Sequence, residues 1–318
     1  MNNTMLYTLT VLIWGSTWYA ITFQLGEVHP VVSVGYRFML ASCVLFAFLK
    51  LFKKNPTFQF SYRQHKFIAL QGLFLFSLNY VLFYFGTSFL TSGLVAILFS
   101  TMTLMNIFNQ ALFFKIKIKK QVLLGSLIGL VGILLVFWPE VTGIQLGDDI
   151  VQGIILCLVA SYFASLGNMV SMKNSRDKIP VMESNAYGML YGAGFSLLLA
   201  IMMGASFTFE ITYGYTLSMI YLAIFGSAIA FGCYLTLIKN IGADKAAYTA
   251  ILFPLVALTI STIFENYTWT QLSVCGVILT LFGNVIAMKA PKRSKITRIQ
   301  QSFDIVPSSQ LQENLRKP

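Results

Sequence analysis

The residues of this chain that could do chemistry are neutral polar and aromatic side chains, set at helical spacing inside long apolar runs. In the first run, Trp14, Thr17 and Trp18 share one face, because they lie three and four residues apart. Similar side chains stand in five later runs: Asn79, Tyr80, Tyr84, Thr103, Asn106, Tyr162, Asn168, Tyr234 and Tyr248. Together they would line a cavity with aromatic walls and neutral hydrogen-bonding groups, suited to a small amphipathic or zwitterionic solute. The alternative is that they only pack and hydrogen-bond between helices.

Three further residues are candidates for gating or structure. Arg37 lies about six residues into the second apolar run, where it could hold a solute carboxylate or pair with Glu265 or Glu27 near the outer end. We favour a structural pair, or a side chain that extends to the outer surface. Pro254 removes a backbone donor and is expected to bend the helix that contains it.

The elements that must position these residues are membrane-spanning helices. Of the 318 residues, 57% are hydrophobic and 10% are charged, whereas a soluble domain carries about 25% charged residues. The apolar runs are unbroken and about 20 residues long, which favours helices over the strands of a membrane barrel. Ten spans are predicted: 4–24, 31–51, 66–87, 92–114, 121–138, 150–171, 183–204, 216–238, 246–265 and 270–289. The fold class is therefore an all-α polytopic membrane protein.

The basic residues predict the orientation of these spans. Every lysine and arginine except Arg37 falls in a link from an even to an odd span or in the segment after residue 288, while the opposite links carry acids. The positive-inside rule then places both termini in the cytoplasm of a bacterial-type inner membrane. This distribution explains the net charge of +11 without a nucleic-acid partner.

The sequence lacks the signatures of several classes of protein. The predicted spans hold no acid or histidine at mid-depth, and the four cysteines fall in apolar stretches as expected of small core residues. No phosphate-binding GxxxxGK[ST] loop occurs. We therefore expect no enzyme, no cofactor and no metal. The missing mid-span carboxylate favours facilitated diffusion or exchange over proton antiport.

The two halves of the chain are weakly similar in sequence. Gly125-x6-Gly132 in the first half returns 151 residues later as Gly276-x6-Gly283. A unit of five spans must be inverted when it is repeated, and inverted repeats are a transporter design. The expected divisions are residues 1–140, residues 141–290 and a basic cytoplasmic tail, 291–318, that is expected to be disordered.

Four segments resemble a known family. They are WGSTWYAI (14–21), GYRFMLAS (35–42), LNYVLFYFGTSFLTSGLVAILFS (78–100) and GSAIAFGCYLTLIKNIGADKAA (226–247). In their order and spacing they resemble the EamA-type transporters of the drug/metabolite transporter superfamily, over about residues 1–290. Two departures concern gating: Thr103 stands where the family often has proline, and FKIK (114–117) lacks the usual acid.

This resemblance implies ten helices around a central cavity, alternating access, and export of a small metabolite such as an amino acid. The partners expected are a small-molecule substrate and the lipid bilayer, with no oligomeric state assigned. Two alternatives stay open. One is an uptake or exchange carrier for a larger, nucleotide-like metabolite, and the other is a membrane receptor or scaffold that transports nothing.

Overall fold

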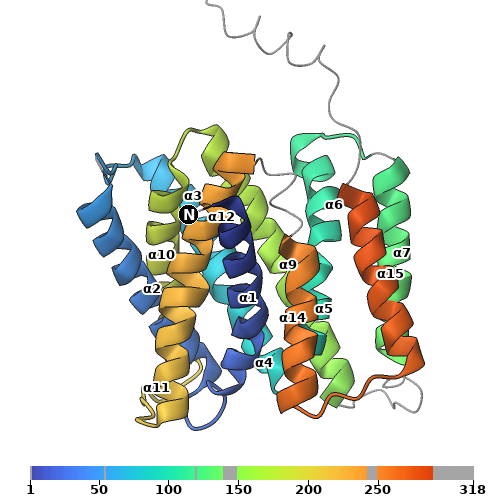
Figure 1. Cartoon of the computed structure of the whole chain (residues 1–318). Helices are drawn as coiled ribbons and strands as arrows, with labels where there is room; N and C mark the ends of the chain where they lie inside the picture. Colours follow the sequence, from blue (N-terminus) through green and yellow to red (C-terminus); the bar gives the residue numbers. More distant parts are fainter. Residues whose placement is uncertain (1, 54, 119, 139–148, 242–248, 289–318) are drawn as a thin grey trace, which may run out of the picture. The chain divides into compact units, whose positions relative to one another are not determined.

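The structure is a computed structural model, and it describes residues 2–53, 55–118, 120–138, 149–241 and 249–288. These residues form helices and short connections, with no strand among them (Figure 1). The helices, with π-helical segments labelled η, are α1 (Asn3–Thr22), α2 (Pro30–Phe52), α3 (Tyr62–Leu73), η1 (Phe74–Leu78), α4 (Asn79–Thr87), α5 (Ser92–Ser100), α6 (Met102–Phe114), α7 (Lys120–Val136), α9 (Asp149–Arg176), α10 (Val181–Met202), α11 (Tyr213–Ile220), η2 (Tyr221–Ile229), α12 (Ala230–Ile241), α14 (Thr249–Phe264) and α15 (Gln271–Met288).

A helix, or a run of helices, lies at each predicted span, with ends in the described parts that differ by a few residues. Three of the spans are composite: α3, η1 and α4 form one, α5 and α6 another, and α11, η2 and α12 a third. Six segments are long and apolar enough to cross a bilayer on that basis alone, and α7, Leu252–Phe264 and Gln271–Ala287 are shorter apolar helices. The protein is an integral membrane protein of the all-α polytopic class.

Local sequence signals start several of the helices. The Asn2 side chain accepts a hydrogen bond of 2.8 Å from the Met5 backbone N–H at the start of α1. Pro30 opens α2, where its missing N–H costs no helical hydrogen bond. Ser61 and Gln64 form a reciprocal capping box at the start of α3.

The packing of the helices repeats between the two halves. Helix α7 packs against α15, and α2 packs against α10 (Figure 1). Other large contacts have a counterpart five spans further along. The contact of α1 with α14 matches that of α9 with α5 and α6, and the contact of α4 with α9 matches that of α12 with α1. Such a pattern is expected of two related halves joined about a pseudo-twofold axis.

The glycines that recur in the sequence meet at the contact between α7 and α15. A Cβ atom built on Gly125 would lie 2.6 Å from the carbonyl oxygen of Gly283, and one on Gly132 would lie 2.6 Å from that of Gly276. The first glycine of each pair therefore faces the second glycine of the other pair. Small residues at this spacing let two helix backbones approach closely in a membrane.

The two π-helical segments occupy matching places in the two halves. Segment η1, moved 151 residues along the chain, falls on Phe225–Ile229, which lies inside η2. Ser227 in η2 donates to the carbonyl oxygen of Leu222, five residues back. Because π-helical turns are uncommon and cluster at functional sites, a matching pair singles out these two spans.

Two ends of the bundle are named here by their charges. The basic end carries Lys53, Lys115 and Arg176, together with the start of α1. The acidic end, at the other tip of the helices, carries Glu27 and Glu265.

Candidate functional site

The centre of the candidate site is Arg37, on α2 two turns after its start. Its side chain is 1% exposed, and its Nη1 donates to the Tyr84 hydroxyl at 3.5 Å. The guanidinium carbon lies 4.7 Å from the ring centre of Tyr80 and 5.3 Å from that of Phe38. Both distances are in the range of a cation–π interaction.

Arg37 does not adopt either of the arrangements favoured by the sequence analysis. A side chain reaching the surface is wrong, because Arg37 shares its helix face with Val34 and Ala41, which are fully buried. A pair with Glu265 or Glu27 is also wrong. Glu265 accepts hydrogen bonds from Ser92 instead, and Glu27 is exposed. In the described ranges, the ion pairs are Lys53–Glu183 and Lys173–Asp177, so Arg37 has no carboxylate there.

Helices α1 and η2 close the site from the other side. A Cβ atom on Gly226 would lie 2.7 Å from Thr17 Cγ2 and 3.6 Å from Arg37 Nη2, so Gly226 lets both groups come close. Trp14 Nε1 donates to the Gly226 carbonyl oxygen at 3.3 Å. We call Arg37, Thr17, Tyr80, Tyr84 and Gly226 the arginine cluster; it joins α1, α2, α4 and η2.

The two tryptophans of α1 pack against further aromatic rings. Trp14 packs on Phe231 and Tyr234, with ring centres 5.5 and 5.0 Å apart. Trp18 packs on Phe83 and Phe99, with ring centres 5.1 and 5.2 Å apart. Aromatic side chains therefore line the candidate site on the side of Trp14 and on the side of Trp18.

Asn79 adds a second polar group whose bonding is incomplete. It is the first residue of α4, directly after η1, and its side chain is 3% exposed. Its Oδ1 has no hydrogen-bond partner among the described residues. A buried carbonyl oxygen without a donor is costly, and in a membrane protein it often marks a ligand site.

Among the described residues, several other members of the predicted site are not part of the arginine cluster. Asn168 on α9 donates to Asn106 Oδ1 at 3.4 Å and Met102 Sδ at 3.3 Å, so these amides join α6 to α9, and Thr103 is half-buried on α6. Tyr162 is 42% exposed on the outside of α9. Pro254 is buried within α14. Tyr248 lies outside the described residues.

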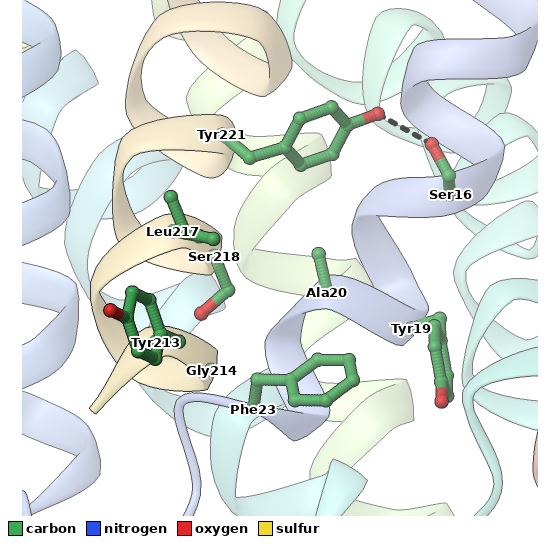
Figure 2. Close-up of a pocket in the computed structure, with 9 residues that line it drawn as sticks. All are labelled: Ser16, Tyr19, Ala20, Phe23, Tyr213, Gly214, Leu217, Ser218 and Tyr221. Carbon is green, nitrogen blue, oxygen red and sulfur yellow. Dashed lines mark hydrogen bonds between the residues drawn. The ribbon is translucent and has the colours of Figure 1, made fainter.

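A groove opens beside the cluster, on the outward side of the contact between α1 and η2. It has a volume of about 520 Å³ and is lined by Ser16, Tyr19, Ala20, Phe23, Tyr213, Gly214, Leu217, Ser218 and Tyr221 (Figure 2). Ser16 Oγ and the Tyr221 hydroxyl, 2.6 Å apart, hydrogen-bond across its upper part in Figure 2. The sequence analysis missed this groove, and tyrosines near span ends are its only sequence signal.

Glu265 closes the acidic end. Its carboxylate accepts hydrogen bonds of 3.1 Å from the Ser92 backbone N–H and a further one from the Ser92 hydroxyl. The last turn of α14 thereby caps the start of α5, where the helix dipole favours a negative charge. This contact ties together two spans that occupy equivalent places in the two halves.

The basic end holds polar contacts that the sequence analysis missed. Glu183, in the first turn of α10, is fully buried and pairs with Lys53. Nearby, the Gln71 side chain donates to Asn185 at 2.8 Å and accepts from Asn174 at 2.9 Å. In the sequence, Glu183 lies at the edge of a predicted span, so its burial was not expected.

Comparisons with known proteins agree with this architecture. The model of the EamA-like transporter family matches twice, at residues 4–138 and 151–288. Protein PagO of Salmonella typhimurium is 26% identical over 302 residues, covering 91% of this chain and 95% of that protein. The uncharacterized inner membrane transporter YedA of Escherichia coli K12 is 30% identical over 286 residues, covering 86% and 87%.

More distant similarities point the same way. The uncharacterized transporter YoaV of Bacillus subtilis is 25% identical over 273 residues, which is 86% of this chain and 91% of YoaV. One solved protein structure aligns with a TM-score of 0.66 over 90% of this chain and 96% of its own, at 15% identity. That last likeness concerns the fold alone.

Proposed function

This chain belongs to the EamA-like transporter family and is a membrane transporter, and from that premise we propose that it is a secondary carrier of a small metabolite that works by alternating access. The observation that carries the proposal is the pairing of two related halves around one buried polar site. Inverted repeats with a site at their interface are the usual construction of such carriers.

The boundaries of the two halves follow from this proposal. Residues 1–140 form the first repeat and residues 141–290 the second, with the reciprocal glycine contact of α7 with α15 joining them. The matching places of η1 and η2 support the same division. Residues 291–318 would be a basic cytoplasmic tail, by the charge rule that places both termini inside a bacterial inner membrane.

The packing supports a state that is closed at the acidic end. There α5 packs against α14, and Glu265 binds the first residue of α5. Spans four (α5 and α6) and nine (α14) are equivalent in the two halves. Toward the basic end they pack against different neighbours, α6 against α9 and α14 against α1, so they diverge from each other. If the basic end faces the cytoplasm, this state would exchange its solute with the cytoplasm, and the proposal of export rests on the family resemblance.

The site residues proposed for substrate contact are those of the arginine cluster and its walls. Trp14 and Thr17 lie on α1, whereas Tyr80 and Tyr84 lie on α4, so a solute held between these two spans would be released when the spans move apart. Mid-depth acids are lacking in the described parts of the spans, and Glu183 at the basic end is already paired with Lys53. We therefore keep the proposal of exchange or facilitated diffusion.

Counterflow in proteoliposomes tests this function. Vesicles with the purified chain are loaded with one unlabelled metabolite at a time from a panel, and entry of the labelled form is followed. We expect accelerated entry for a few compounds, and a several-fold loss in Trp14→Ala. Trp269→Ala is the matched control, because Trp269 lies beyond the end of α14 and is 42% exposed. Equal loss in both variants would contradict the proposed site.

A further inference from the structure

The charge of Arg37 is not neutralised by its described surroundings. The groups around its guanidinium are a phenol, two aromatic faces and the backbone of a glycine, and all of these are neutral. A cation held in an apolar span is costly unless an anion or water accompanies it. The side chain is 1% exposed, so bulk water does not solve this problem.

One edge of the guanidinium is still free to bind. Nη1 donates to Tyr84, but Nε has no hydrogen-bond partner in the described part of the chain. Nε and Nη2 point the same way and form the fork that takes a carboxylate in two parallel hydrogen bonds. Nη2 faces Gly226, whose missing side chain lets both Nη2 and Thr17 Cγ2 approach the backbone, since a Cβ atom there would lie 3.6 and 2.7 Å from them.

We propose that the Nε and Nη2 edge of Arg37 binds the carboxylate of a small solute that carries one such group, so that the carrier is selective for monocarboxylates, including zwitterionic ones. This inference rests on the proposed carrier function and names its substrate class. One guanidinium neutralises one negative charge, and the cluster contains no second cation. A phosphate dianion would leave a net negative charge in an apolar site, so a carboxylate fits better.

The side chains around Arg37 indicate which other groups the solute would carry. Tyr80 already stacks on the guanidinium, and Trp14 hydrogen-bonds the backbone of Gly226. Their rings would contact the apolar part of a solute whose acid group lies on Arg37. The buried Oδ1 of Asn79, one residue before Tyr80, would accept a hydrogen bond from a donor group on the same solute.

Matched pairs of solutes test the inference. The full chain is purified in detergent, and its thermal unfolding is followed with lactate against lactamide and with leucine against leucinamide, together with labelled counterflow of each. We expect at least one carboxylate to raise the Tm and its carboxamide to bind at least ten-fold more weakly. Arg37→Met removes this preference. The matched control is Arg176→Met, because Arg176 also stacks on a ring, 4.1 Å from Phe114, but lies at the basic end.

A second measurement needs no ligand. If the charge of Arg37 is uncompensated when no solute is bound, Arg37→Met removes that charge, and the Tm of the ligand-free protein stays equal or rises by several degrees. If Arg37 instead stabilises the fold through Tyr80 and Tyr84, the Tm falls. A lower Tm, or equal binding of acid and amide in the wild type, would overturn the inference.

The outcomes separate this inference from the proposed function. Carboxylates that stabilise the protein without any counterflow would support the anion site and contradict the carrier. Counterflow that is unaffected by amidation and by Arg37→Met would support the carrier and overturn the anion site.

Discussion

Gly132 on α7 and Gly276 on α15 face each other so closely that a Cβ atom on either would lie within 2.6 Å of the other's carbonyl oxygen. The same relation holds between Gly125 and Gly283. Because the neighbouring atoms are backbone, no side-chain rotation can make room. The two spans are therefore in contact along one seam that only glycine permits.

Gly276→Ala should consequently separate α15 from α7. We expect a loss of about 1–3 kcal/mol in the free energy of unfolding, the usual cost of overpacking. The matched control is Gly194→Ala on α10, where an added Cβ would meet nothing within 4 Å. It should be neutral or slightly stabilising, because alanine favours a helix more than glycine does. Equal effects of the two substitutions, in thermal unfolding of the purified protein, would contradict the seam.

Glu265→Gln should loosen the acidic end. The amide keeps the shape of the side chain, but it removes the charge that caps α5 through Ser92. We expect the backbone N–H groups in the first turn of α5 to exchange with deuterium about ten-fold faster, which corresponds to about 1.4 kcal/mol. Glu210→Gln is the control, because Glu210 lies in the same end region, is partly exposed and, in the described part of the chain, bonds only to nearby Thr212. Unchanged protection in Glu265→Gln would show that this carboxylate does not hold the two spans together.

Lys53→Met should destabilise the basic end, because it leaves the fully buried Glu183 without its cation. The expected loss is about 2 kcal/mol, in the range for a broken hydrogen bond to a charged group. The double variant Lys53→Met with Glu183→Gln should regain most of it, since the buried charge is then gone. Lys173→Met, at a partly exposed pair with Asp177, should cost less than about 1 kcal/mol. A double variant no more stable than Lys53→Met would contradict this reading of Glu183.

Gly226→Ala should press α1 away from η2, because the new methyl group would lie 2.7 Å from Thr17 Cγ2. We expect lower stability and slower counterflow. Thr17→Ser removes that Cγ2 atom, so adding it to Gly226→Ala should restore the Tm. The methyl group would still cover Nη2 of Arg37, so the preference for carboxylates should stay reduced. Recovery of both properties would mean that Gly226 matters for packing alone.

The sequence predicted the course of the chain well, because the apolar runs and the charges between them are strong signals. The helical membrane class followed from them and is confirmed, whereas the division of the chain into two inverted repeats stays a prediction. The glycine spacing in spans five and ten was interpreted as a sign of a repeat, and the structure adds that these glycines form the contact between α7 and α15.

The site was less predictable, because it depends on which helix faces meet. Asn79 is buried and Trp14 is partly buried, and their contact with a solute stays a prediction, whereas Arg37 was misjudged because its depth and neighbours come from the packing of four spans. It also missed η1 and η2, since no composition signal marks a π-helical turn. Glu183 was missed because a span edge and a buried ion pair look alike in one sequence.

The measurement that tests the central claim most directly is trans-acceleration in proteoliposomes with labelled carboxylates. The account predicts that entry of a label is accelerated when the same solute is loaded inside, that Arg37→Met abolishes this acceleration, and that Arg176→Met leaves it intact. Entry that is independent of the internal solute would contradict alternating access. Acceleration that survives Arg37→Met unchanged would contradict the arginine cluster as the place where the solute is held.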